Sequence, residues 1–158
     1  MKNLSYRECQ IGRRFILRLE PGARISESLV EFTRGMKAPF ASLVSAVGSI
    51  RMVEFVDIQA GAHLPISGAR LKTHKVEGPL ELLSLEGNLL PDDKGELSAR
   101  LYVLGSKSSG EVVGGRLVEA EVFASCEIVL AEYNVTGIER QFSPQSGVDA
   151  LVIREDLP

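Results

Sequence analysis

The strongest constraint on the fold is a pair of alternating apolar and polar runs within residues 97–118, LSARLYVLGSKSSGEVVGGRLV. Apolar side chains occupy every second position of LSARLYV, and the alternation resumes after the polar run GSKSSG. A period of two on both sides of a Gly/Ser-rich segment predicts a β-hairpin. Glycine inside a strand costs stability, so the pair Gly114-Gly115 indicates a bulge, or a close approach by another backbone or a ligand. We therefore expect a site at this hairpin.

The rest of the chain predicts further strands and one clear helix. Ile25, Leu29, Phe32 and Met36 follow a helical spacing within residues 24–36. Further strands are expected at residues 7–19, 40–47 (ended by Gly48-Ser49), 51–58, 71–90 (interrupted at Gly78-Pro79), 119–133 and 150–153. Strands that follow one another without intervening helices favour antiparallel pairing.

We therefore predict one α+β domain over residues 1–158, with a mostly antiparallel sheet of about seven strands and one main covering helix. A sheet with few covering helices leaves one face uncovered, and that face has to be buried in another way. Either oligomerisation or closure into a barrel would bury it.

Composition narrows the function classes. The net charge of −3 argues against a nucleic-acid footprint over the whole surface, but it leaves room for a local basic patch. Six basic residues in the first 24 positions form a candidate patch, for which a solvated strand face is the commoner explanation. They are Lys2, Arg7, Arg13, Arg14, Arg18 and Arg24, against Glu8 and Glu20.

The two cysteines, Cys9 and Cys126, lie far apart and lack metal-ligand spacing, which favours reduced thiols in a cytoplasmic protein. Cys126 lies in an apolar run and is expected in the core. No apolar stretch is long enough for a spanning helix, so no membrane partner is expected.

Familiar catalytic motifs are absent. The sequence contains no GxxxxGK[ST] phosphate loop and no GxSxG elbow. Of its two histidines, His63 falls in an expected loop, and only His74 lies on a strand that could face a cleft. Because zinc needs three or four ligands, we predict neither a metal nor a cofactor, and we assign no catalytic residue.

Four segments, taken in order, resemble the plant-and-prokaryote-conserved (PPC) domain: EPGARISESLVEFTRG, FASLVSAVGSIR, EGPLELLSLEGNL and GEVVGGRLVEAEVFASCEIVL. The resemblance covers nearly the whole chain, and its most specific part is the glycine pair followed by AEVF. It implies an antiparallel α/β sheet, a homotrimer, and a DNA-binding or DNA-associated regulatory role. In plants the domain accompanies AT-hook motifs, but this sequence has neither an AT-hook nor a helix-turn-helix pattern.

One departure from the family pattern is informative. Many prokaryotic members carry an HLH strand and a GGH segment whose histidines suit zinc. Here the corresponding positions are Arg100-Leu101-Tyr102 and Gly114-Gly115-Arg116. Arginine stays protonated and cannot ligate zinc, and neutral tyrosine is a poor ligand. The zinc site that the resemblance implies is therefore not expected.

Arg100 and Tyr102 are two positions apart on one strand and share a face. If the hairpin register adds Arg116, the resulting pocket suits a carboxylate or a phosphate, which guanidinium groups bind bidentately. The alternative is that acidic neighbours such as Glu81 and Glu86 neutralise these arginines in ion pairs.

Three functional hypotheses follow. The first is a DNA-associated homotrimeric module, and the second is a protein that binds a small anion. The third is a metal-independent enzyme with Glu121 or His74 as acid or base, although the resemblance of this fold to the zinc enzyme acetolactate decarboxylase fails at the missing histidines. The candidate ligand-binding residues are Arg100, Tyr102, Arg116, Gly114, Gly115, His74 and Glu121.

Overall fold

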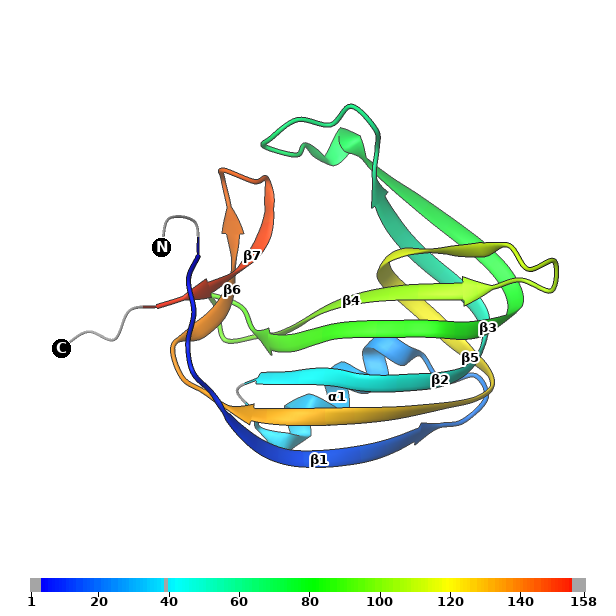
Figure 1. Cartoon of the computed structure of the whole chain (residues 1–158), viewed down its shortest axis with the longest axis horizontal. Helices are drawn as coiled ribbons and strands as arrows, with labels where there is room; N and C mark the ends of the chain where they lie inside the picture. Colours follow the sequence, from blue (N-terminus) through cyan, green and yellow to red (C-terminus); the bar gives the residue numbers. More distant parts are fainter. Residues whose placement is uncertain (1–3, 39, 155–158) are drawn as a thin grey trace.

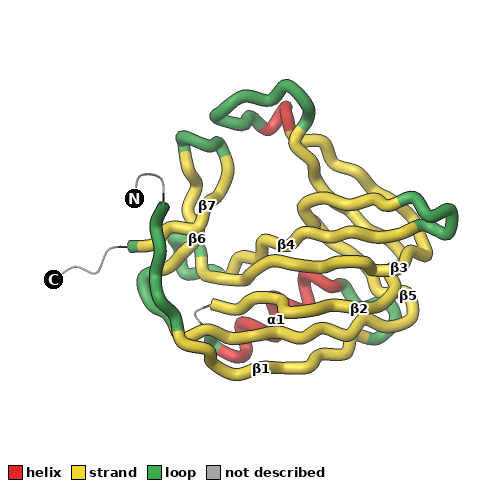
Figure 2. The backbone as a smooth tube through the Cα atoms, viewed as in Figure 1, coloured by secondary structure: helices red, strands yellow, loops and turns green. Residues whose placement is uncertain are grey.

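The computed structural model describes residues 4–38 and 40–154, and it has the predicted α+β architecture (Figures 1 and 2). The elements are β1 (Gln10–Leu19), α1 (Ile25–Met36), β2 (Phe40–Ile58), the 3-10 turn η1 (Gly68–Arg70), β3 (Leu71–Pro91), β4 (Leu97–Ser106), β5 (Val112–Asn134), β6 (Ile138–Ser143) and β7 (Val148–Ile153). All pairings between these strands are antiparallel.

The sheet closes on itself at one end. Its strand order is β1-β5-β2-β3-β4, and β4 pairs back onto the first residues of β5. Long strand β5 therefore joins β2 along most of its length and β4 at its start. Closure, one of the two predicted ways to hide a face of the sheet, is present here between residues 102–106 and 112–116.

Two of the expected strand breaks are wrong. Gly48 does not end a strand, because β2 runs on through it to Ile58. A side chain at Gly48 would overlap the carbonyl of Ser125, so glycine allows two strands to approach closely there. Gly78-Pro79 likewise lies within β3, where Gly78 packs against the carbonyl of Ile50. At Gly48 and at Gly78-Pro79 the strand therefore bends and continues instead of ending.

Helix α1 covers one face of the sheet (Figure 1). Ile25 and Leu29, fully buried, pack into the core formed by β2 to β5. The first turn of the helix has no side-chain cap of its own, and Glu119 of β5 supplies one. Its carboxylate accepts hydrogen bonds from the backbone N–H groups of Ser26 (2.8 Å) and Glu27 (3.3 Å). A carboxylate at a helix N-terminus also complements the helix dipole.

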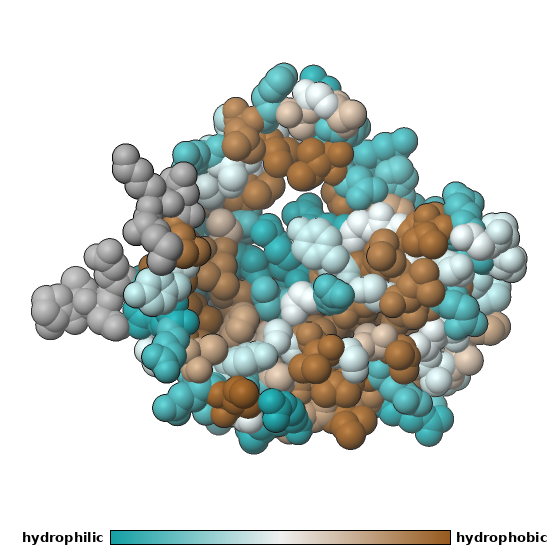
Figure 3. Space-filling view, in the orientation of Figure 1, coloured by the Kyte–Doolittle hydropathy of each residue, from teal (hydrophilic) through white to brown (hydrophobic). Residues whose placement is uncertain are grey.

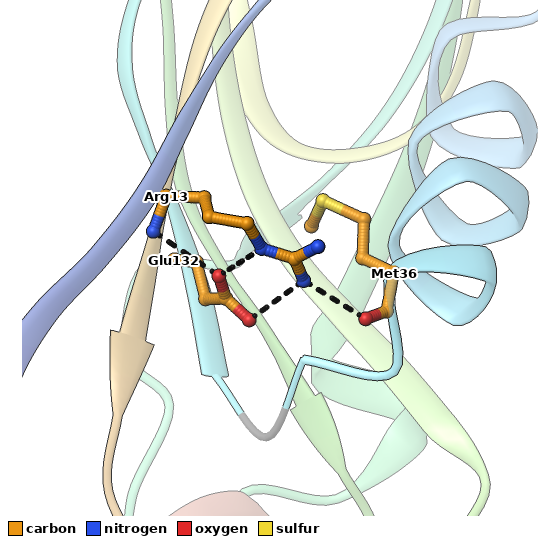
Figure 4. A network of polar contacts seen from close by, with 3 residues as sticks. All are labelled: Arg13, Met36 and Glu132. Atoms are coloured by element: carbon orange, nitrogen blue, oxygen red, sulfur yellow. Dashed lines mark hydrogen bonds and ion pairs between the residues drawn. The ribbon is translucent and has the colours of Figure 1, made fainter.

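The other end of α1 is tied to the sheet by Arg13 and Glu132 (Figure 4). Arg13 Nε and Nη2 donate to Glu132 Oε2 at 2.7 Å and Oε1 at 3.0 Å, and Nη2 also donates to the Met36 carbonyl at 3.0 Å. The side chain of Glu132 is 9% exposed, whereas that of Arg13 is 57% exposed. Hydrogen bonds from Arg13 hold the pKa of Glu132 below its ordinary value.

We expect Glu132→Gln to lower Tm by several degrees at neutral pH and to have less effect in acid. A depressed carboxyl pKa stabilises the fold above the unfolded-state pKa of about 4.3, and this contribution is lost as pH falls through the folded-state pKa. Thermal unfolding of wild type and variant from neutral to acidic pH measures the difference. A difference in Tm that stays constant across that range would show that the ion pair is not responsible.

The structure confirms the prediction that Cys126 lies in the core. Cys126 is fully buried on β5, whereas Cys9 is exposed, and both are free thiols. Burial, with a smaller contribution from the charge of Glu127, raises the pKa of Cys126 to about 11. Cys126 is therefore an inert core residue.

Candidate anion pocket

A pocket of about 270 Å³ lies on the outer side of the β4–β5 hairpin. It is lined by Val56, Asp57, Ile58, Ile66, Leu71, Arg100, Tyr102, Gly115, Arg116 and Val148. The space-filling view shows a hollow below the loop at the top of the molecule, with hydrophilic surface inside it and hydrophobic surface above (Figure 3). Four of the predicted site residues, Arg100, Tyr102, Gly115 and Arg116, therefore line one cavity.

The alternation of β4 determines which side chains reach this pocket. Leu101 and Val103 point into the core and are 2% exposed, so Arg100 and Tyr102 point to the opposite face. Tyr102 is paired directly with Arg116 of β5. Directly opposed residues on antiparallel strands have Cβ atoms about 5 Å apart, so this register places the phenol beside the second guanidinium.

The roof of the pocket comes from segments distant in sequence. The loop between β2 and β3 contributes Ile66, and the β6–β7 hairpin contributes Val148. The two segments are joined where the Ile66 N–H donates to the Ser146 carbonyl at 2.8 Å. Figure 1 shows this loop and the β6–β7 hairpin on the same side of β4, with the loop reaching toward the tip of the hairpin. They convert the outward-facing row of β4 into a concave site.

The glycine pair is explained by two close approaches. A side chain at Gly114 would overlap the backbone carbonyl of Val103, and one at Gly115 would overlap the carboxylate of Asp57. Gly114 therefore allows the β4–β5 hairpin to close tightly, whereas Gly115 leaves room at the pocket wall for Asp57. The close approach at Gly114 is made by another backbone, which is one of the explanations that the sequence suggested for the glycine pair.

The arginines of the pocket have no ion-pair partner within residues 4–38 and 40–154. Glu86 lies opposite Tyr102 but accepts a hydrogen bond from Ser84, and Glu81 lies opposite Ser106 at the far end of β4. Neither glutamate neutralises Arg100 or Arg116, so the ion-pair alternative that named these two glutamates is not realised.

The other three predicted residues, Gly114, His74 and Glu121, lie outside the pocket lining. His74 stacks on Phe55 with ring centroids 5.1 Å apart, and its Nε2 lies 3.7 Å from Asp57 Oδ2. His74 therefore contacts Asp57, which lines the pocket, without lining it itself. Glu121 pairs with Arg51 at 3.0 Å. It lies five positions beyond Arg116 along β5, about 16 Å away at the rise of an extended strand.

The apolar part of the pocket has no counterpart among the sequence predictions. Val56, Ile58, Ile66, Leu71 and Val148 come from three separate segments. The alternation of β2 and β3 could have placed Val56, Ile58 and Leu71 on strands, but it could not show which loop and which hairpin fold over them.

The sequence profile described as the Plants and Prokaryotes Conserved (PCC) domain matches residues 6–134. The chain belongs to this family. No curated protein sequence matches the chain.

Solved structures agree with the PCC assignment. A metal-containing protein from Archaeoglobus fulgidus is 28% identical, with a TM-score of 0.81 over 94% of this chain and 99% of that chain. A plant- and prokaryote-conserved (PPC) protein from Pyrococcus horikoshii is 26% identical, with a TM-score of 0.79 over 98% and 99%. A structure from Ralstonia eutropha JMP134 named "Putative DNA-binding protein" is 15% identical, with a TM-score of 0.74 over 88% and 90%, and it shows the fold alone.

A metal does not fit the hairpin site of this PCC domain. Its polar groups at the hairpin are two guanidiniums and a phenol, and guanidinium has no lone pair to offer a cation. Across the described ranges, no group of three or more His, Cys, Asp or Glu residues could hold a metal ion. The described helices also include none long and apolar enough to cross a membrane.

Proposed function

We propose that this PCC-domain chain binds a small organic anion, a carboxylate or a phosphate, in the pocket beside the β4–β5 hairpin. The observation that carries the proposal is the convergence of Arg100, Tyr102 and Arg116 on one cavity, with no neutralising ion pair among the described residues. Two guanidinium forks and a phenol offer several donors to an anionic group, whereas a cation would need acceptors.

The shape of the pocket supports a ligand with an apolar body. Its volume of about 270 Å³ is close to the lower end of the range for small-molecule sites. Aliphatic side chains form much of the rest of the wall. Among the described residues, Asp57 is the one carboxylate in the lining, so two fixed positive charges face one negative charge and the pocket keeps a net positive charge.

Ligand-dependent stabilisation tests this function, with benzoate and phenyl phosphate as probes. At about one hundred times its Kd, a probe that binds only the folded chain adds about 2.7 kcal/mol to the free energy of unfolding. This corresponds to a rise of about 5–10 °C in Tm. We expect Arg100→Ala to weaken binding tenfold to a hundredfold, because a charge-assisted hydrogen bond contributes about 1.5–3 kcal/mol.

Lys107→Ala is the matched control. Lys107 lies at the end of the same hairpin, where it pairs with Glu111 at 2.8 Å, and it is outside the pocket lining. Its removal is expected to leave the stabilisation unchanged. No stabilisation of wild type by either probe, or equal losses in the two variants, would contradict the proposal.

We also propose that the chain functions as a homotrimer, as the family resemblance implies. Large apolar side chains remain exposed on β1 and β2, the two strands that flank β5, among them Ile16 (85%), Val44 (58%) and Val47 (59%). Exposed apolar side chains that recur on one sheet favour contact with another protein surface. Light scattering after gel filtration is expected to give about three times the chain mass of 17.2 kDa, and a monomeric mass would contradict the assembly.

A DNA-associated regulatory role is the second candidate, and we propose that it is indirect. The name carried by the Ralstonia structure supports an association with DNA. The basic residues near the N-terminus do not support direct binding, because three of them are in ion pairs: Arg13 with Glu132, Arg18 with Glu20, and Arg24 with Glu27 and Glu119. Lys2 lies outside the described residues. The anion-bound state would then be the signal, and a protein partner would make the DNA contacts.

A further inference from the structure

A buried arginine that the hairpin motif does not include lies next to the pocket. Arg140 of β6 is 5% exposed, and its Nε is buried without a hydrogen-bond partner among the described residues. Its Nη2 donates to Asn88 Oδ1 at 2.6 Å. No carboxylate of the described residues lies within ion-pair distance of it. A buried guanidinium without an ion-pair partner is costly, so its retention calls for a compensating interaction.

The position of Asn88 places this charge beside the pocket. Asn88 of β3 is paired directly with Arg100 of β4, and Arg100 lines the cavity. A hydrogen bond to Asn88 therefore brings Arg140 next to Arg100. The same β6–β7 hairpin supplies Val148 to the pocket wall, so one element contributes both an apolar contact and a cation.

The electrostatics agree with this placement. Burial lowers the pKa of Arg140, and the nearby charge of Arg100 lowers it further, whereas Asp149 and Tyr102 act in the opposite direction. Two positive charges held this close repel each other unless an anion lies between or beside them. Arg100 and Arg116 line the cavity, and Arg140 lies outside the lining, next to Arg100, through its bond to Asn88.

We propose that Arg140 adds a third positive charge to the anion site from just outside the pocket lining, and that together with Arg100 and Arg116 it selects a phosphate monoester with a small apolar body over a monocarboxylate. The inference rests on the proposed function. Three guanidinium charges in and beside one cavity suit a single head group with two negative charges. The aliphatic wall receives the ester group.

Calorimetric titration of the full chain with phenyl phosphate and with benzoate tests the inference, because the two probes share a ring and differ in charge. Wild type is expected to bind phenyl phosphate at least about tenfold more tightly. Arg140→Met is expected to weaken phenyl phosphate tenfold to a hundredfold and benzoate much less, so that most of the preference is lost. Arg154→Gln is the matched control, since Arg154 follows the same hairpin but pairs with Glu139.

Arg140→Met is expected to fold, because the substitution removes a buried charge that has no ion-pair partner and fills the space with an apolar side chain of similar length. If it does not fold, Arg140→Lys replaces it; one charge without the planar fork is expected to give an intermediate preference. An unchanged preference in the folded variant would overturn the role of Arg140 and leave the anion pocket standing. Equal affinity of wild type for the two probes would overturn the selection of a phosphate monoester. Binding of neither probe would overturn the proposed function itself.

Discussion

Gly114→Ala is expected to lower the free energy of unfolding by at least about 3 kcal/mol, at the upper end of the usual cost of overpacking. The added methyl group would overlap the carbonyl oxygen of Val103, a backbone atom that cannot rotate away. Relief requires β4 and β5 to separate where they close the sheet. Chemical denaturation measures the loss, and binding of phenyl phosphate should weaken with it, because Tyr102 and Arg116 face each other across the same pair of strands.

Gly35→Ala is the matched control for this prediction. Gly35 is exposed on α1, and a methyl group added there would have no atom within 4 Å. Alanine is favoured over glycine in a helix by about 0.5–1 kcal/mol, so this variant is expected to gain stability. If both variants had the same small effect, the close approach of β4 and β5 would not be the reason for glycine at position 114.

The sequence was most informative on β4, where a single apolar–polar alternation predicted both the strand and the residues of the site. The alternation around Leu101 predicted a strand with a buried face, and it also placed Arg100 and Tyr102 together on the other face. Residue types that exclude zinc and suit an anion indicated the chemistry of that second face. Pairing of Tyr102 with Arg116 then followed from the length of the loop between the two strands.

The rest of the pocket depends on long-range packing that local pattern does not encode. Residues 136–154 lack a strong period, and the sequence predicted a short last strand at residues 150–153 without the partner strand β6. Arg140 was missed for that reason. An arginine between Glu139 and Gln141 indicates an exposed position by default, and only the structure, with its contact to Asn88, shows that it is buried.

Direct binding of duplex DNA is expected to be weak and to disappear at about 200 mM salt. A protein that makes six to ten phosphate contacts loses about 10³–10⁵ in affinity between about 50 and 200 mM salt. The affinity that remains depends on how many Lys and Arg side chains are free to contact phosphates. On β1 and the loop after it, Arg13, Arg18 and Arg24 are already in ion pairs. Arg14 has no such partner among the described residues. The net charge of −3 adds a repulsive background.

Anisotropy of a labelled duplex titrated with the chain at about 50 and 200 mM salt measures this dependence. We expect any binding at the lower salt to weaken in Arg14→Ala and to be unaffected by Arg140→Met, because the two arginines belong to different surfaces. Saturable binding at the higher salt, with a slope that requires six or more phosphate contacts, would contradict an indirect role. It would place the DNA contacts on a surface formed by several copies of the chain, since the described part of one copy does not present that many unpaired cations on β1. Absence of binding, together with stabilisation by phenyl phosphate, would favour the pocket as the site through which this PCC domain acts.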